Sequence, residues 1–287
     1  MKKILFLTLA LILNGCSKSA TDAKPPVPPK LIVFISIDQF RYDYLTRYAS
    51  FFSEDGFNHL IKKGANFVHC QYGHAVTKTS VGHAVMMSGA LPCTTGIVAN
   101  HWFDRDLRRL TYSVEDTMSP LLGLEQKSHR DGRSPQKFNG TNLGDVLKQH
   151  NGNKSKVFAV SCKDDASILM AGRSANAAYW MNDAEGGFFT SSYYLKTYPE
   201  WVAAFNRERS FDKWFGAKWD LLLEEKDYPT IDTSNMRYYD YPKGWSGTLP
   251  YQIGISMEKP DADYYNLLLE SPFSSEALLD FTERLVV

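Results

Sequence analysis

The run LIVFISI at residues 31–37 is the first segment of the chain with the character of a buried strand, and the prediction of the fold class begins with it. Its apolar and β-branched residues are continuous, whereas a half-buried strand alternates apolar and polar residues. Asp38 ends the run, and an amphipathic pattern follows from about Tyr42 to Lys63. A buried strand, an acidic turn and a helix predict the opening of an α/β unit.

Asp38 is a candidate functional residue because it follows the carboxyl end of this predicted strand. Open α/β sheets bind their ligands at that end of their strands. The structural alternative is that Asp38 only caps the helix that follows.

The α/β pattern continues along the chain. We expect a strand over 65–72, a helix over 80–87, a helix that begins near 139–141 and runs through 147, and another buried strand over 156–161. A final helix over 275–287 places Leu278, Phe281 and Leu285 on one face. Of the 16 tyrosines, 11 follow residue 178. The stretch of about 178–260 is therefore interpreted as an aromatic-rich insertion or cap, with ordinary core packing as the alternative.

Composition limits the class of protein. The chain has 287 residues, of which 44% are hydrophobic and 22% charged, as in globular proteins that bury a core. Its 32 basic residues balance its 32 acidic residues. This balance gives no electrostatic reason to expect binding to nucleic acid or to an anionic membrane surface.

The N-terminus has the pattern of an export signal. Lys2 and Lys3 precede a ten-residue apolar run over 4–13 that only Thr8 interrupts, too short to span a bilayer. Residues 13–16, LNGC, resemble a bacterial lipobox, so Cys16 would carry a lipid; a plain cleaved signal is the alternative. We therefore predict a signal peptide over 1–15, a lipidated proline-rich tether over 16–30, and a periplasmic or outer-membrane lipoprotein of a bacterium, anchored to the membrane only by its lipid.

The remaining cysteines are three in number, Cys70, Cys93 and Cys162, which is an odd count for an oxidising compartment. A disulfide between Cys70 and Cys93 is one possibility.

Four segments occur in a particular order: ISIDQ at 35–39, TKTSVGHA at 77–84, SGALP at 88–92 with GIVANHWFD at 96–104, and SCKDD at 161–165. Together they resemble the phosphate-irrepressible alkaline phosphatases of the nucleotide pyrophosphatase/phosphodiesterase branch of the alkaline phosphatase superfamily. The resemblance covers residues 31 to 210. It implies an α/β fold with a mixed central sheet flanked by helices.

The resemblance also assigns roles. Asp38 and Thr79 would bind zinc, Thr79 would be the nucleophile that becomes phosphorylated, Asn100 would donate to a phosphate oxygen, and Lys163 would be the cation that stabilises the transition state. Thr79, Asn100 and Lys163 would thus be both catalytic and substrate-binding, with small phosphate esters as substrates and two zinc ions as cofactors. Zinc coordination favours the alkoxide of a threonine, which is otherwise a poor nucleophile. His83 and His101 would be packed or capping residues.

Each role has a structural alternative. Thr79 could be a helix N-cap, Asn100 a turn residue and Lys163 a solvated charge after a strand.

One position departs from the resembling monoesterases, which carry an arginine two residues after the lysine. This chain has Asp165 there, which reverses the sign of a close interaction with phosphate. Three explanations stay open: Asp165 points elsewhere, Arg173 or another basic residue substitutes, or hydrolysis of monoesters is weakened relative to diesters.

Length is the second departure. The family supplies further zinc ligands from a more C-terminal Ser-x-x-Asp-x-x-Gly-His motif, which this chain lacks, and no histidine follows residue 210. Residues 31–287 are therefore interpreted as the N-terminal part of an alkaline-phosphatase-like domain whose C-terminal part is missing. The predicted function is a zinc-dependent phosphate-ester hydrolase that forms a covalent phosphothreonine. The alternative is a truncated, catalytically inactive remnant; a carbohydrate-binding lipoprotein would explain only the aromatic residues.

Overall fold

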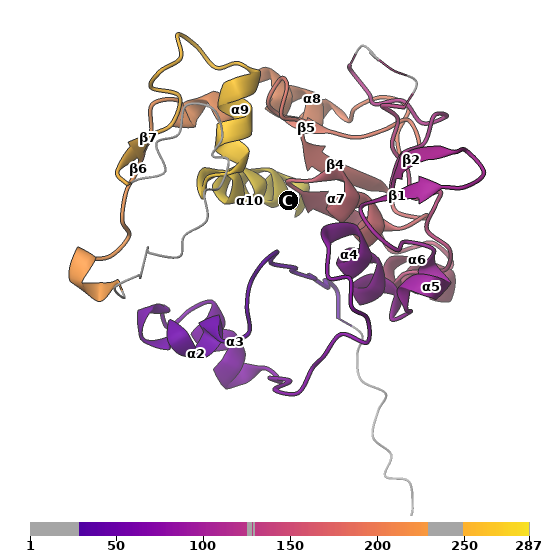
Figure 1. Ribbon diagram of the computed structural model, residues 1–287, viewed down its shortest axis with the longest axis horizontal. Coiled ribbons are helices and arrows are strands. Elements are labelled where there is room, and N and C mark those ends of the chain that lie inside the picture. The colour runs from indigo at the N-terminus through magenta and orange to yellow at the C-terminus, as the bar shows by residue number, and fades with distance from the viewer. Residues whose placement is uncertain (1–28, 125–127, 129, 229–248, 287) are drawn as a thin grey trace, which may run out of the picture. The chain divides into compact units, whose positions relative to one another are not determined.

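The computed structural model describes residues 29–124, 128, 130–228 and 249–286 (Figure 1). The predicted signal peptide, Cys16 and most of the tether lie outside these residues. The chain divides into two compact units, residues 1–42 and 43–287. Among the helices of the described ranges, none combines the length and the apolar character that a membrane span requires.

The run at 31–37 is not a strand, and the prediction that it is buried is wrong. Residues 31–37 take no regular secondary structure, and the side chains of Leu31, Val33 and Ile35 are 61%, 65% and 73% exposed. Asp38 lies in the turn that follows. An apolar sequence supplies side chains for a strand, but the backbone N–H and C=O groups also need a neighbouring strand, and the described residues of this unit provide none.

Residues 43–78 form short helices instead of the continuous helix predicted to Lys63. These are α2 (Tyr44–Arg47), the 3₁₀ helix η1 (Ala49–Phe51) and α3 (Phe57–Lys63). The helical path breaks where Phe52 becomes extended and Gly56 adopts a φ of 68°, a conformation that favours glycine. The strand predicted over 65–72 is also wrong, since these residues form loop and turn.

The central sheet has the order β3-β4-β5, made of β3 (Phe158–Ser161), β4 (Ala177–Met181) and β5 (Phe188–Phe189). β3 and β4 are parallel, with Phe158 opposite Ala177, and β4 and β5 are antiparallel. The crossover between the parallel strands is α7 (Asp164–Ala171), whose Ile168 and Leu169 are fully buried. The strand predicted over 156–161 is thus confirmed as β3, and it gives the βαβ unit that the sequence pattern indicated. Its predicted burial is wrong, because Phe158 is 41% exposed and the other three residues of β3 are only partly buried.

Helix α4 (Thr79–Ser88) packs against α7 and confirms the helix predicted over 80–87. After α5 (Pro92–Thr95), an antiparallel hairpin pairs β1 (His101–Asp104) with β2 (Arg109–Tyr112). Helix α6 (Leu143–His150) is the predicted helix, but its N-cap is Asn142, three residues after Asn139, because the Asn142 and Asp145 side chains form a reciprocal capping box. A core of Ala84, Ile97, Phe138, Ile168 and Trp180 joins these elements.

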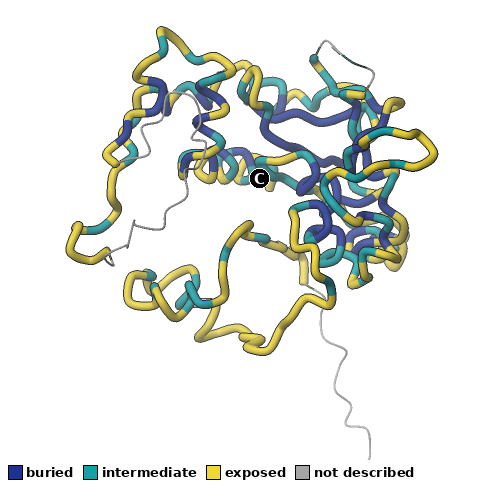
Figure 2. Tube along the Cα trace, viewed as in Figure 1, coloured by how far each residue is buried: buried dark blue, intermediate teal, exposed yellow. Residues whose placement is uncertain are grey.

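The C-terminal elements are α8 (Glu200–Arg207), η2 (Ser210–Trp214), β6 (Lys218–Trp219), η3 (Glu225–Asp227), β7 (Tyr251–Gln252), α9 (Ala262–Leu269) and α10 (Phe273–Val286). Residues of α8, η2, β7, α9 and α10 form a second core against β4 and β5. Phe281 lies at its centre, with ring centroids 3.9 Å from Phe188, 4.9 Å from Trp201 and 5.1 Å from Phe205. Figure 2 shows the buried trace along β4 and β5 that this core covers. The helix predicted over 275–287 is confirmed, and Leu278 and Leu285 pack on the same core as Phe281.

This packing of aromatic rings favours the ordinary-core explanation for the aromatic residues after 178. The boundaries of an insertion at about 178–260 stay a prediction.

Cys70, Cys93 and Cys162 are free thiols, so a disulfide between Cys70 and Cys93 is wrong for this structure. Cys93 lies on α5, where its Sγ is 4.0 Å from the Thr94 hydroxyl rather than beside another thiol.

Candidate functional site

Thr79 is the first residue of α4, as the sequence predicted. The N-cap position belongs to the extended residue Lys78, so the alternative that Thr79 is the N-cap is wrong. The imidazole of His83 lies one turn further along the helix, and its Nδ1 donates to the Thr79 carbonyl over 2.7 Å. His83 is buried, in agreement with the prediction of a packed histidine.

Asn100 is held beside this helix start by its side chain and its backbone. Its Oδ1 accepts a hydrogen bond from the backbone N–H of Ser80 over 3.0 Å, and its carbonyl accepts from the N–H of Ser113 over 2.9 Å. Since Oδ1 binds Ser80, the two hydrogens on Nδ2 are what the Asn100 amide can offer to a substrate oxygen. Asn100 itself lies at a bend, and its side chain also binds the start of α4.

Lys163 is the N-cap of α7 and follows the carboxyl end of β3. Its backbone N–H donates to the Ser161 hydroxyl over 3.2 Å, while the residue as a whole is exposed. The lysine thus stands where parallel strands present residues to ligands.

Asp165 joins the first turns of α4 and α7. Its carboxylate is buried, 2% exposed, and one oxygen accepts from the Ser80 hydroxyl over 2.6 Å. Ser80 also lies 2.7 Å from the Ser113 hydroxyl, measured between Oγ atoms. Burial raises the pKa of Asp165 above its usual range, while the bond from Ser80 opposes that rise. Of the three explanations for this residue, the structure supports the first, in which Asp165 points inward.

Ser80 therefore connects the three predicted residues of the second unit. Thr79 precedes it in the chain, Asn100 binds its N–H, and Lys163 stands two residues before its carboxylate partner, Asp165. Asp38 belongs to the other unit, residues 1–42.

A set of residues that the sequence did not reveal surrounds Asp164. Its carboxylate accepts from Arg133 Nε over 2.5 Å and from the Tyr112 hydroxyl over 2.6 Å, and the Arg133 guanidinium lies over the Tyr112 ring at 5.2 Å. Burial raises the pKa of Tyr112 well above its ordinary value, as does the charge of Asp164. His101 stacks on Tyr112 with ring centroids 4.7 Å apart. These partners are 31 and 52 positions from Asp164, so no local pattern could have indicated them.

Arg173 does not take the place of the missing arginine. It follows the opposite end of α7, about 12 Å along an eight-residue helix from Lys163. Its guanidinium donates to the carbonyl oxygens of Phe138 and Gln136.

Metal ligands do not gather within the described residues. No group of three or more histidine, cysteine, aspartate or glutamate side chains among them could hold a metal ion. Zinc usually takes three or four protein ligands. The part of the chain that the structure describes therefore does not fit a complete zinc site.

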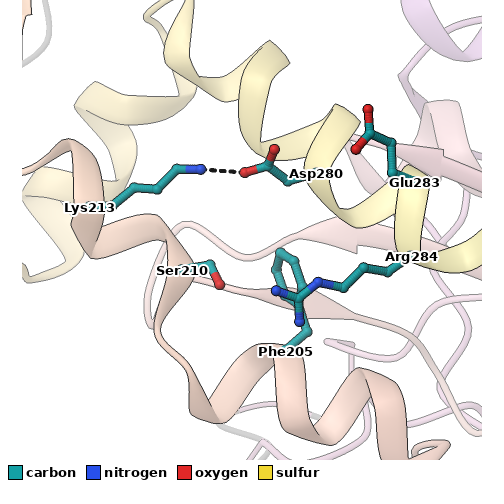
Figure 3. Close-up of a pocket in the computed structure, with 6 residues that line it drawn as sticks. All are labelled: Phe205, Ser210, Lys213, Asp280, Glu283 and Arg284. Atoms are coloured by element: carbon teal, nitrogen blue, oxygen red, sulfur yellow. Dashed lines mark hydrogen bonds and ion pairs between the residues drawn. The ribbon is translucent and has the colours of Figure 1, made fainter.

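An open cavity of about 710 Å³ lies between α8, η2 and α10 and is separate from these residues (Figure 3). Lys213 pairs with Asp280 across it, and the Arg284 guanidinium lies 4.9 Å from the centroid of the Phe205 ring. The lining residues are Phe205, Ser210, Lys213, Asp280, Glu283 and Arg284. The charged side chains of this cavity are of both signs and largely paired with one another or with neighbours. The cavity contains none of Thr79, Asn100 and Lys163.

Comparison with known proteins identifies the family of this chain. The family described as type I phosphodiesterase / nucleotide pyrophosphatase matches residues 32–272. The chain belongs to this family. The chain is similar to the alkaline phosphatase PhoV of Synechococcus elongatus, with 34% identity over 99% of this chain and 53% of PhoV. The alkaline phosphatase PafA of Elizabethkingia meningoseptica is 32% identical over 88% of this chain and 50% of PafA.

The crystal structure of wild-type PafA is similar to this chain, with a TM-score of 0.75 and 30% sequence identity. The match covers 86% of this chain and 47% of the PafA chain. The resemblance to alkaline phosphatases and the alkaline-phosphatase-like α/β fold are thus confirmed. The chain spans about half the length of the curated relatives it matches.

Proposed function

We propose that this chain carries the nucleophile side of a phosphate-ester hydrolase of the alkaline phosphatase and phosphodiesterase type, with Thr79 as nucleophile. One observation carries the proposal: Thr79 opens α4 at the point where Ser80 binds both Asn100 and the buried residue Asp165 of α7. Family membership supports the reaction class.

The side chains at this point suit a phosphoryl group. A helix N-terminus presents backbone N–H groups and a positive dipole to an anion. The Asn100 Nδ2 hydrogens and the Lys163 ammonium are further donors for the charge that develops on phosphate oxygens. Small phosphate esters are therefore the proposed substrates.

The proposed reaction has two steps. The Thr79 Oγ1–P bond forms while the bond from phosphorus to the leaving oxygen breaks; the threonine proton passes to solvent and the leaving oxygen takes one up. Water then attacks phosphorus and breaks the Thr79 Oγ1–P bond, which releases the phosphate and restores the hydroxyl.

Zinc dependence belongs to the proposal through the resemblance, with Asp38 and Thr79 as the ligands that this chain would contribute. The described residues do not complete a zinc site. Zinc content of the purified chain is therefore a measurement separate from hydrolysis.

The nucleophile is tested by comparing Thr79→Ala with Thr77→Ala, an exposed threonine in the loop that precedes α4. With zinc present, Thr79→Ala is expected to lower hydrolysis of p-nitrophenyl phosphate and of its bis-ester by about a thousandfold or more. Thr77→Ala is expected to stay near the wild-type rate. Hydrolysis that Thr79→Ala leaves undiminished would exclude this nucleophile.

The alternative of a catalytically inactive remnant has its own outcome in these measurements. It is supported if the 287-residue chain binds no zinc and hydrolyses neither ester, while fusion to the sequence encoded directly downstream restores hydrolysis that depends on Thr79. About two zinc ions per chain would contradict it.

We also propose that the protein is exported and lipidated at Cys16, on the basis of the N-terminal sequence. Metabolic labelling with a radioactive fatty acid should mark the wild-type chain in bacteria and leave Cys16→Ala unmarked. Label on the variant would contradict lipidation at Cys16.

A further inference from the structure

Asp165 has no part in the chemistry proposed above, yet it is among the most completely buried acids of the described chain. Asp165 is 2% exposed, and its hydrogen-bond partner Ser80 is fully buried. A carboxylate buried in this way needs hydrogen-bond donors around it. Asp165 receives them from the Ser80 hydroxyl and from the backbone N–H of Ala166, over 2.6 and 2.9 Å.

The hydrogen bonds around Ser80 have a direction. An ionised carboxylate only accepts, so the Ser80 hydroxyl donates its single hydrogen to Asp165. The contact of 2.7 Å between the hydroxyl oxygens of Ser80 and Ser113 then requires that Ser113 donates. The Ser80 hydroxyl is thus held by two hydrogen bonds, one that it donates to Asp165 and one that it accepts from Ser113.

The effect reaches Asn100 through the backbone of Ser80. The Ser80 N–H donates to Asn100 Oδ1 over 3.0 Å, and this bond decides which end of the amide Asn100 presents to the outside. Ser113 adds a second link, because its own N–H binds the Asn100 carbonyl. Ser80 of α4 and Ser113 after β2 thus both bind Asn100, and Asp165 of α7 acts on it through Ser80.

The two helix starts also compensate the buried charge. Ser80 lies in the first turn of α4 and Asp165 in the first turn of α7, and both helix N-termini carry partial positive charge. The resembling monoesterases have an arginine that would bind phosphate at position 165, whereas in this chain Asp165 binds Ser80 and Ala166.

We propose that Asp165 is a positioning residue, which through Ser80 holds the first turn of α4 beside Thr79 and orients the Asn100 amide with Nδ2 outward. This inference rests on the proposed function in one respect: the orientation of Asn100 matters for catalysis because the proposed function makes Asn100 a donor to the substrate. The placement of Asn100 itself can be measured without any activity.

The test uses amide spectra of the full 287-residue chain labelled with ¹⁵N. In Asp165→Ala the Ser80 hydroxyl loses its acceptor, so exchange of the Ser80 amide hydrogen is expected to accelerate about tenfold and the Asn100 side-chain amide signals to move. Asp165→Asn is expected to restore both, because its amide can still bond to Ser80. Glu200→Gln, a neutralisation on an exposed part of α8, is the matched control and should change neither.

A local positioning role predicts changes only near Ser80 and Asn100, whereas a role in general stability predicts changes throughout the packed elements. If Asp165→Ala raises exchange equally in α6 and α8, its role is general stability and the proposal is wrong. It is also wrong if the Ser80 and Asn100 signals stay at their wild-type positions. Should Asp165→Ala fail to fold, Ser80→Ala removes the same link while keeping the helix, and the Asn100 signals must then move.

Binding of inorganic phosphate separates this proposal from the proposed function. If Asp165→Ala moves the Asn100 signals but Asn100→Ala binds phosphate as the wild type does, positioning is supported and the role of Asn100 as a phosphate donor is not. If Asn100→Ala weakens binding while Asp165→Ala leaves the Asn100 signals unmoved, the reverse holds.

Discussion

The runs at 31–37 and at 156–161 both have strand-like sequences but differ in structure. Residues 31–37 are exposed and take no regular structure, whereas 158–161 form β3. β3 pairs in parallel with β4, and α7 packs over it. The earlier run, which is more apolar, lacks such neighbours among the described residues of its unit. The difference teaches that pairing and cover, more than β propensity, decide whether an apolar run becomes a strand.

The same contrast extends to the regions around the two runs. From residue 29 to residue 78, no residue is buried, although helices form there (Figure 2). Beyond residue 78, two hydrophobic cores bury all five residues of β4. We call these the exposed segment, residues 29–78, and the packed region, the described residues 79–286. Three predictions compare them.

Hydrogen exchange should give the largest difference. Amides of β4 are expected to exchange at least about a hundredfold more slowly than amides of 31–37, because opening of a paired, buried strand costs free energy that an exposed run does not require. Exchange of the full chain followed by mass spectrometry measures both. Strong protection of 31–37 would break the comparison, since it would show a strand with a partner.

Removal of one ring should have the next largest effect. Phe281→Ala is expected to lower the free energy of unfolding by about 3–5 kcal/mol, because the ring is fully buried and contacts four other rings. Phe34→Ala, at a ring 45% exposed, is the matched control, with a change of about 0.5 kcal/mol or less. Urea denaturation compares the two, and equal losses would contradict the assignment of Phe34 to an exposed position.

Acid should distinguish two glutamates by a smaller amount. Burial raises the pKa of Glu115, but hydrogen bonds from Arg109 and Arg130 outweigh burial and lower it from 4.5 to about 2. A carboxylate whose pKa is lower in the folded state stabilises above its unfolded pKa, and this stabilisation is lost as the pH falls from about 4.5 to about 2. The contribution is at most about 3 kcal/mol.

Glu115→Gln should therefore remove stability at pH 7 and flatten the pH dependence between these limits, as followed by denaturation at several pH values. Glu54 in the exposed segment, whose side chain is 84% exposed beside Lys62, is the control. Glu54→Gln should change stability by less than about 1 kcal/mol at any pH. A pH dependence that survives in Glu115→Gln would place the acid sensitivity elsewhere.

Local sequence was sufficient for the elements with strong periodicity and clear boundaries. The helix start at Thr79 and the face of α10 that holds Leu278 and Phe281 could be predicted, because helical spacing and capping are properties of neighbouring residues. The same local patterns failed at 31–37 and at 65–72, where a strand requires a partner that sequence spacing does not reveal.

The candidate site shows the same division. Thr79, Asn100 and Lys163 were identified from the ordered motifs, because a resemblance to a family can be recognised in the sequence alone. The motif did not reveal that Ser80 links them, nor that Arg133 and Tyr112 hold Asp164, because those hydrogen bonds join residues 20 to 85 positions apart.

The motifs of the amino-acid sequence were enough to identify the family, the helix that begins at Thr79 and the unusual acid at position 165. The contacts of that acid are known only from the folded chain. A carboxylate beside a phosphate and a carboxylate buried between two helix starts have the same sequence signature. They differ only in the neighbours that surround the charge, and these neighbours come from the packing of α4 on α7.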